Sequence, residues 1–182
     1  MMKTAQNDIN IFALTDSHQE TRKLCRLFSR IIEDTPAKGK NTLICDCGDL
    51  FKGIYHRELS IESYQTLRRQ LPEAKIVLAL GNNDFGFDLE GFKFLQQAVK
   101  RFHQANIHVL CANLQDMATG RCPSWVDPYI LLDINHKKIM ITAFCINQVR
   151  LNKYGVILKD IPETFASLAA EIKHIEPDAL IV

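Results

Sequence analysis

The chain has 182 residues, of which 47% are hydrophobic and 24% are charged, and its formal net charge is +1. This composition is typical of one globular domain with a sizeable core. A net charge so close to zero, without a long run of like charges, argues against a nucleic-acid or membrane partner and favours a small molecule. The polar segment 1–8 contains no signal-peptide core and no span of about 20 apolar residues, so we expect a cytoplasmic protein.

Short apolar runs alternate with amphipathic stretches along the chain. The apolar runs predict strands over 9–15, 42–46, 75–80, 107–111 and 179–182. Helical periodicity predicts helices over 20–33, 59–70, 88–104 and 162–174. Segments 129–134 and 138–144 predict a hairpin with its turn at 135–137, because Asn is favoured in turns. This alternation indicates an α/β fold, in which ligands bind at the carboxyl ends of the strands.

The six cysteines are dispersed and lack CxxC spacing. We therefore expect buried free thiols rather than the disulfide framework of a secreted domain. Cys45 and Cys47 alternate along one predicted strand and so share a face, which leaves a weak site for a soft metal open.

Three polar segments follow the first three predicted strands. The first contains Asp16 and His18, whose i, i+2 spacing in an extended backbone lets both side chains reach one divalent cation. The second places Asp49 in a tight loop between two glycines, and its carboxylate can bridge a pair of cations about 3.5–4 Å apart. The third contains Asn82, a neutral oxygen ligand that leaves the pair of cations attractive to a phosphate. Each segment alone is more often a helix cap or a plain turn, but together they predict a two-metal site for phosphoester chemistry.

These segments resemble the first three motifs of the calcineurin-like metallophosphoesterase superfamily. The matching stretches are Asp16-x-His18, Gly48-Asp49-x-x-x-Gly53 and Gly81-Asn82-x-Asp84. Segments 109–114 and 128–142 are similar to the catalytic domain of the bacterial 5'-nucleotidase and UDP-sugar hydrolase branch. The resemblance implies a metallophosphoesterase-like layered sandwich of mixed β-sheets flanked by helices.

The resemblance also implies a role for each candidate ligand. Asp16 and His18 bind the first metal, Asp49 bridges the two metals, and Asn82 binds the second. Mn, Zn, Fe and Mg suit this ligand set nearly equally. The implied substrate is a phosphate ester, in particular a nucleotide, whose phosphate is attacked by a water that the metals activate.

Two departures from the family pattern affect the predicted chemistry. The nucleotidase branch has a His where this chain has Asn83, and an Asp that orients that His where this chain has Gly86. We therefore take Asn83 and Asp84 as the catalytic residues in place of the His motif. Loss of a general acid typically lowers a rate by about 10²–10⁴-fold, so we expect weak activity from this chain alone.

The family's later Gly-His-x-His segment does not occur in these 182 residues, so we expect 1–182 to be an incomplete domain whose C-terminal part is missing. The apolar strand at 179–182 then favours a homo-oligomer or a complementing chain that pairs with it. We expect the remaining histidines to be solvated or packed rather than metal ligands; they are His56, His103, His108, His136 and His174.

Three functional interpretations remain open from the sequence. The first is a metal-dependent phosphoester hydrolase of the 5'-nucleotidase type. The second is a phosphodiesterase of the same superfamily. The third is a non-catalytic metal- or nucleotide-binding remnant or half-protein that needs a partner chain.

Overall fold

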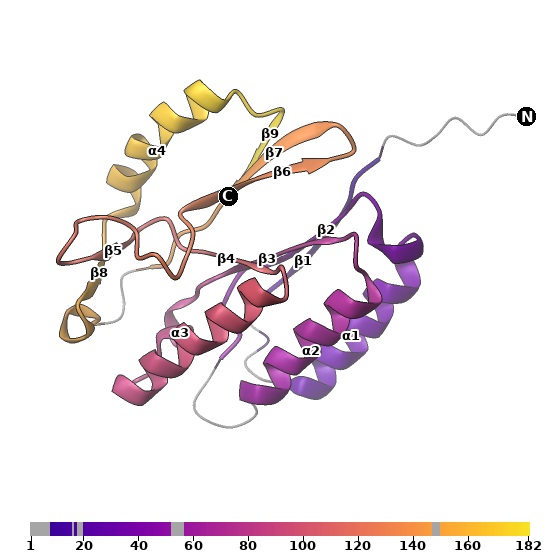
Figure 1. Ribbon diagram of the computed structural model, residues 1–182, viewed down its shortest axis with the longest axis horizontal. Coiled ribbons are helices and arrows are strands. Elements are labelled where there is room, and N and C mark those ends of the chain that lie inside the picture. Colours follow the sequence, from indigo (N-terminus) through magenta and orange to yellow (C-terminus); the bar gives the residue numbers. More distant parts are fainter. Residues whose placement is uncertain (1–7, 16, 18–19, 52–56, 147–149) are drawn as a thin grey trace, which may run out of the picture.

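The computed structural model describes residues 8–15, 17, 20–51, 57–146 and 150–182. Four strands form a parallel sheet in chain order: β1 (Asn10–Leu14), β2 (Thr42–Asp46), β3 (Lys75–Ala79) and β4 (His108–Leu110). Their register places Asn10 opposite Thr42, Leu43 opposite Lys75 and Val77 opposite His108. Three helices cover one face of this sheet (Figure 1); they are α1 (Thr21–Asp34), α2 (Arg57–Gln70) and α3 (Leu89–Gln104).

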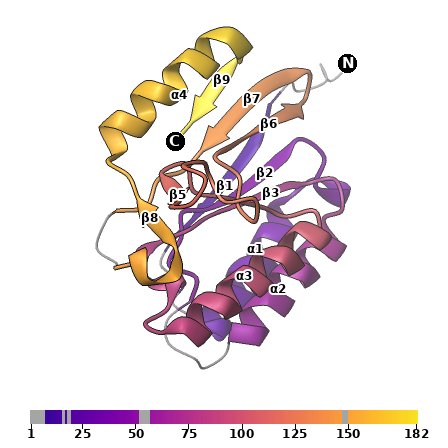
Figure 2. The ribbon, with the colours of Figure 1, turned by 60° about the vertical axis from the view of Figure 1, so that its left-hand side comes forward.

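A second sheet covers the opposite face of the first. It contains β6 (Tyr129–Ile134), β7 (Lys137–Thr142) and β9 (Ala179–Ile181), with β7 antiparallel to β6 and parallel to β9. Helix α4 (Ile161–Ile175) lies on the outer side of this sheet (Figure 2). The layers therefore run helix, sheet, sheet, helix, which confirms the predicted layered sandwich.

Shorter elements complete the described structure. Strands β5 (Leu114–Asp116) and β8 (Val156–Leu158) form an antiparallel pair. Three single-turn 3₁₀ helices are present: η1 (Ala37–Gly39), η2 (Asn82–Phe85) and η3 (Asn152–Tyr154).

The core has two apolar layers, one on each side of the parallel sheet. Strand β2 supplies both of them: Ile44 packs in the cluster beneath the helices, and Leu43 packs in the cluster between the two sheets. Both side chains are fully buried. A strand buried on both faces requires a continuous apolar run, which explains why the parallel strands are readily recognised in the sequence.

The predicted helices and long strands are confirmed, with ends that shift by one or two residues. Asp88, predicted as the first residue of a helix, is the N-cap of α3 and accepts a hydrogen bond from the Gly91 N–H at 2.7 Å. The hairpin turn occupies two residues rather than three, because Asn135 and His136 both have positive φ, at 51° and 63°. These values match a two-residue turn of the primed type, which leaves Lys137 in β7. The pairing of β5 with β8 was not predicted.

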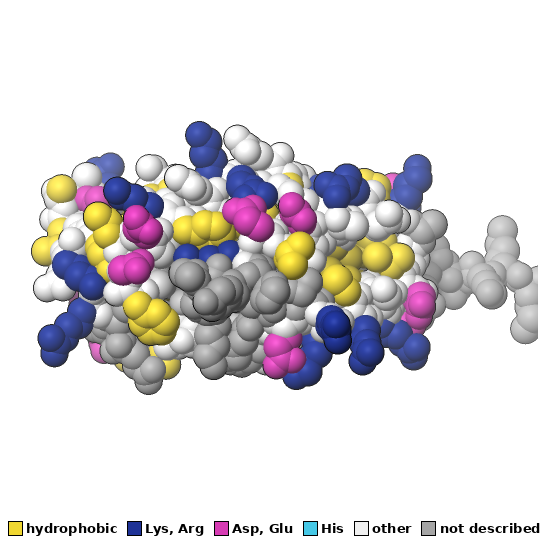
Figure 3. All heavy atoms as spheres, turned by 90° about the horizontal axis from the view of Figure 1, so that it is seen from below, with side chains coloured by type: hydrophobic (Ala, Val, Ile, Leu, Met, Phe, Trp, Pro, Cys, Tyr) yellow, Lys and Arg dark blue, Asp and Glu magenta, His cyan; other side chains and the backbone are white. Residues whose placement is uncertain are grey.

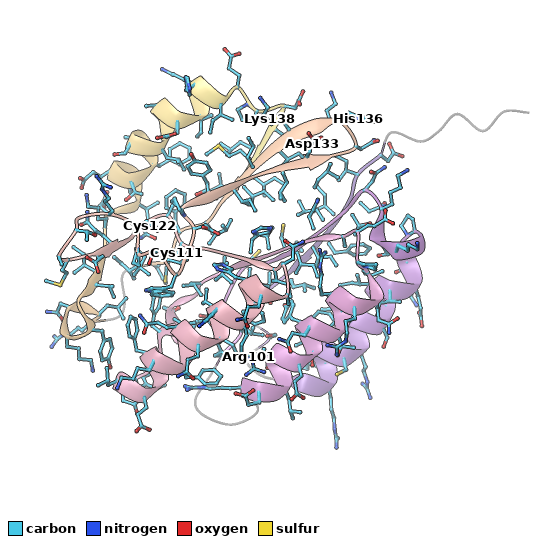
Figure 4. All side chains as sticks on the ribbon, viewed as in Figure 1. Arg101, Cys111, Cys122, Asp133, His136 and Lys138 are labelled. Carbon is cyan, nitrogen blue, oxygen red and sulfur yellow. The ribbon has the colours of Figure 1, made fainter. Side chains whose placement is uncertain are left out.

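The six cysteines all lie in the described part of the chain, and no disulfide joins them. Cys111 and Cys145 are buried as expected, whereas Cys25 and Cys47 are exposed, so the expectation of burial is wrong for these two. Cys111 and Cys122 are neighbours in space (Figure 4), with 3.9 Å between the Cys122 Sγ and the Cys111 carbonyl oxygen.

Basic and acidic side chains are interspersed on the helical face of the molecule (Figure 3). Over its described atoms, apolar side chains form only small patches between them. This mixed surface agrees with the near-zero net charge. Among the described helices, none has the length and apolar character that crossing a membrane requires.

Candidate functional site

The loops that follow β2 and β3 lie against each other at the carboxyl edge of the parallel sheet. Gly48 and Asp49 follow β2, and Gly81 with η2 follows β3. A Cβ on Gly81 would lie 2.2 Å from the Asp49 Oδ1 and 2.4 Å from the Asp49 backbone nitrogen. A Cβ on Gly48 would lie 2.6 Å from the Gly81 nitrogen. Both positions therefore need glycine, because the two loops touch through their backbones.

The side chain of Asp84 ties these two loops together. Its Oδ2 accepts hydrogen bonds from the N–H groups of Gly81 at 2.8 Å and Asp49 at 3.0 Å. Its Oδ1 accepts a hydrogen bond from the Phe51 N–H at 2.7 Å. The residue is only 3% exposed. Asp84 thus fixes the place of Asp49 relative to the turn that carries Asn82 and Asn83.

Asp49 and Asn83 are joined by two hydrogen bonds. The Asp49 Oδ1 accepts from the backbone N–H of Asn83, and the Oδ2 accepts from the Asn83 side-chain amide, each at 2.9 Å. Asp49 has a positive φ of 59°, which turns its carboxylate toward η2. A carboxylate has about four lone-pair sites, so these two bonds leave acceptor capacity for a cation.

Negative charge is concentrated in these loops. Burial raises the pKa of Asp84 to about 7; the Phe51 and Gly81 N–H groups oppose this rise, and the charges of Asp46 and Asp49 add to it. Asp46 is also buried, and it accepts hydrogen bonds from the Tyr64 hydroxyl and, at 2.9 Å, from the Gly48 N–H. Neighbouring carboxylates of this kind favour a bound cation, which would offset their mutual repulsion.

A cavity of about 280 Å³ opens beside the turn that carries Asn82 and Asn83. These two residues line it together with Gly86, Phe87, Arg150, Lys153 and Tyr154. The sequence analysis missed Arg150 and Lys153. Both residues come after β7 in the sequence and belong to no recognised motif. Their position beside the cavity therefore became apparent only from the fold.

The predicted metal ligands are described in part. Asp49 and Asn82 follow neighbouring strands and lie in contacting loops, as predicted. Asp16 and His18 lie outside the described residues. Within the described ranges, no cluster of three or more His, Cys, Asp and Glu side chains can hold a metal ion. The carboxylate of Asp49 and the amide oxygen of Asn82 are hard donors that fit a divalent cation. Because Asp16 and His18 lie outside the described residues, the full ligand set stays a prediction.

The structure gives a physical reason for the glycine at position 86. Gly86 has a φ of +72°, and a Cβ there would lie 2.9 Å from the Gly91 Cα. An aspartate at this position would strain the backbone and overlap α3. The close packing of η2 on α3 is therefore incompatible with an acidic side chain at position 86.

The chain was compared with protein families, curated proteins and solved structures. Residues 9–178 match the family model for calcineurin-like phosphoesterases. No curated protein matches the chain. Among solved structures, the 5'-nucleotidase precursor of Thermus thermophilus superimposes with a TM-score of 0.69 at 16% identity, over 94% of this chain and 36% of that one.

Two further structures share the fold. The NAD nucleotidase of Haemophilus influenzae gives a TM-score of 0.64 at 18% identity, over 94% of this chain and 33% of that one. The sulfate thiohydrolase of Thermus thermophilus superimposes with a TM-score of 0.56 at 9% identity, over 92% of this chain and 29% of that one. This chain thus spans about a third of the length of the two nucleotidases. Since identities this low establish the fold alone, the family rests on the match over 9–178. That match covers most of the chain, and this protein therefore belongs to the calcineurin-like phosphoesterase family.

Proposed function

We propose that residues 1–182 belong to the catalytic domain of a metal-dependent phosphoester hydrolase of the 5'-nucleotidase type. The observation that carries this proposal is the double hydrogen bond between Asp49 and Asn83. It brings the loops of two neighbouring strands together beside a cavity. Asp16, His18, Asp49 and Asn82 would hold two divalent cations. When bound, such cations supply Lewis-acid activation of a water and neutralise the charge of the phosphate.

The described residues have distinct roles in this proposal. Asn83 binds the phosphate: its side-chain amide has two N–H donors, one of which is directed at Asp49. The second can donate to a phosphate oxygen without breaking the first bond. Asp84, predicted from the sequence as a catalytic residue, acts in this proposal as a positioning residue, because among the described residues its carboxylate accepts hydrogen bonds from loop backbone N–H groups. An amide at position 83 cannot protonate a leaving group, so turnover should be slow and should favour esters with good leaving groups.

The test is a comparison of the unmodified chain with Asp49→Asn. We expect calorimetric titration with Mn²⁺ to show binding that the substitution weakens at least tenfold. We also expect the substitution to abolish hydrolysis of p-nitrophenyl phosphate. Asp133→Asn is the matched control, since Asp133 is an exposed residue of the β6–β7 hairpin at the far end of the sheet (Figure 4). Equal Mn²⁺ binding and equal turnover in both variants would refute the proposal.

Replacing Asn83 by histidine should raise turnover of phenyl phosphate, an ester with a poor leaving group, by about tenfold, while turnover of p-nitrophenyl phosphate should change little. An imidazole at this position can donate a proton to the leaving group, which the amide cannot. The gain should fall below the usual effect of a general acid, because Gly86 leaves no room for a carboxylate that would orient the ring. Asn83→Gln keeps an amide and should give no gain in kcat. An equal rise in both variants would show that proton donation is not what limits the reaction.

The amide side chain of Asn83 is also compatible with two alternative functions. A phosphodiesterase would hydrolyse bis-p-nitrophenyl phosphate faster than the monoester, and this comparison belongs in the same assay. A non-catalytic cation-binding protein would bind Mn²⁺ through Asp49 without hydrolysing either ester. Asn83 and Gly86 favour this second alternative, since neither residue can take part in acid catalysis.

Partner and compartment stay predictions. Strand β9 is at the edge of its described sheet, and the side chains of Leu180 and Val182 are exposed. An exposed apolar edge strand suits pairing with a second chain. We also keep the cytoplasmic location as an expectation.

A further inference from the structure

A second cavity, of about 600 Å³, is lined by residues of α3, β5, η3 and β8 and of the loop that follows β5. Tyr154 is the one lining residue that it shares with the cavity beside η2. Its volume lies within the range of about 300–1,000 Å³ that is usual for sites of organic ligands. The cavity therefore has room for a whole organic molecule, and the proposed function makes no use of it.

Two aromatic side chains of this cavity are held in place by a third. Phe92, which is buried, stacks on the Tyr154 ring with 4.8 Å between ring centres. The Trp125 ring meets Phe92 edge to face, with 5.9 Å between ring centres. Trp125 and Tyr154 are half-buried and line the cavity. Rings that are already fixed lose little entropy when a ligand binds, so the cavity offers a preformed surface to another aromatic ring.

One acidic and one basic side chain, Asp116 and Arg121, line the same cavity. The Asp116 backbone N–H donates to the Arg121 carbonyl oxygen at 2.8 Å, so the two residues are neighbours in space. Among the described residues, their side chains pair neither with each other nor with any other charged group. The other lining residues are neutral, so the formal charge of the lining is zero.

The Asp116 carboxylate is fixed through one of its two oxygens. Its Oδ1 accepts hydrogen bonds from the Thr119 backbone N–H at 2.8 Å and from the Thr119 hydroxyl at 3.0 Å. These bonds hold the pKa of Asp116 below its usual range, so the group is ionised at neutral pH. The hydrogen bonds of the described residues leave Oδ2 as an acceptor for a ligand.

The two opposite charges indicate the class of ligand. Neighbouring charges of this kind fit a molecule that carries an ammonium and a carboxylate on adjacent atoms, whereas the Asp116 carboxylate repels a phosphate. A guanidinium binds a carboxylate through paired N–H donors, and an ammonium donates to a carboxylate oxygen. We infer that this cavity binds an aromatic α-amino acid, with its ring against Trp125, its carboxylate on Arg121 and its ammonium on Asp116.

The experiment uses the single tryptophan of the chain, Trp125, as the reporter. The metal-free protein is titrated with L-phenylalanine while Trp125 fluorescence is recorded, and calorimetry measures the same binding independently. We expect saturable binding of L-phenylalanine. Three analogues each lack one recognised group and should bind at least tenfold more weakly: phenethylamine lacks the carboxylate, phenylacetate lacks the ammonium, and L-alanine lacks the ring.

Two substitutions test which side chain binds which group. Arg121→Gln should weaken L-phenylalanine binding by about tenfold and leave phenethylamine binding unchanged, because that analogue has no carboxylate. Asp116→Asn should weaken L-phenylalanine binding by a similar factor and leave phenylacetate binding unchanged. Asparagine keeps an oxygen that can accept from Thr119, so the turn is preserved. Arg26→Gln is the control, since Arg26 is an exposed arginine of α1 that does not line this cavity.

Failure of L-phenylalanine to bind by either method would overturn the inference. Equal affinities for L-phenylalanine and L-alanine would refute the contact with the aromatic walls. Equal affinities for L-phenylalanine and phenylacetate, or an Arg121→Gln effect no larger than that of Arg26→Gln, would refute recognition of the two charges. The titrations involve neither Mn²⁺ nor an ester, so their outcome is independent of the proposed function, which the Asp49→Asn comparison tests.

Discussion

Replacing Gly81 by alanine is expected to abolish Mn²⁺ binding and to lower the free energy of unfolding by about 3 kcal/mol. The new Cβ would lie 2.2 Å from the Asp49 Oδ1 and 2.4 Å from the Asp49 nitrogen. The nitrogen belongs to the backbone, so a side-chain rotation cannot relieve the overlap. The two loops must separate, and separation moves Asp49 away from Asn82. The φ of Gly81 is −89°, an ordinary value for alanine, so the whole effect comes from lost space.

Gly155→Ala is the matched control for this variant. Gly155 has a φ of +79°, but apart from its chain neighbours no described residue has an atom within 4 Å of the position that a Cβ would take, so alanine there is strained without colliding. Its expected cost is about 1–2 kcal/mol, with Mn²⁺ binding unchanged. Urea denaturation measures the stability of both variants, and calorimetry measures their Mn²⁺ binding. If Gly81→Ala behaved like Gly155→Ala in both measurements, the contact between the loops would not govern the site.

Asp84→Asn should destabilise the protein by about 1–3 kcal/mol, although it changes the shape of the side chain very little. Three backbone N–H groups point at the two oxygens of Asp84. An asparagine replaces one oxygen with an NH₂ group, so in either orientation at least one N–H faces another donor inside the core. A buried donor without an acceptor costs its desolvation energy.

Asp88→Asn is the control for this charge removal. Asp88 caps α3 by accepting from Gly91, and asparagine is an equally good N-cap. We therefore expect little change in urea stability for this variant. We also expect weaker Mn²⁺ binding in Asp84→Asn alone, because the Asp49 loop loses its tie to η2. An Asp84→Asn protein with the stability of Asp88→Asn would show that the three N–H groups find other acceptors.

The fold was predictable because each parallel strand contains a short apolar run that is visible in the sequence. Leu43 and Ile44 are buried on opposite faces of β2, so the middle of this strand is apolar and stands out from its polar flanks. The strands of the β5–β8 pair are three residues each, and Leu114 pairs with Leu158 across a long stretch of chain. A run so short has no measurable periodicity. Its pairing depends on packing that a local pattern does not contain.

Only those residues of the candidate site that belong to a sequence motif directly after a predicted strand could be predicted. Asp49 and Asn82 follow apolar strands, so their approach was expected from topology. The contacts of Asp84 with the backbone of residues 49 and 51 join positions more than thirty apart and depend on how two loops meet. The same holds for Arg150, which enters the cavity from a segment without any recognisable pattern.

The burial of several cysteines affects which metal ions this protein can bind. Burial raises the pKa of Cys45 and of Cys145 to about 12, and that of Cys122 to about 11. At neutral pH these sulfurs keep their protons, and a thiol must lose its proton before it can ligate zinc or copper. The core thus does not compete with the oxygen donors of Asp49 and Asn82 for metal. Three of the six cysteines are thereby withdrawn from metal binding, which favours the cation preferences of the predicted ligands Asp16, His18, Asp49 and Asn82.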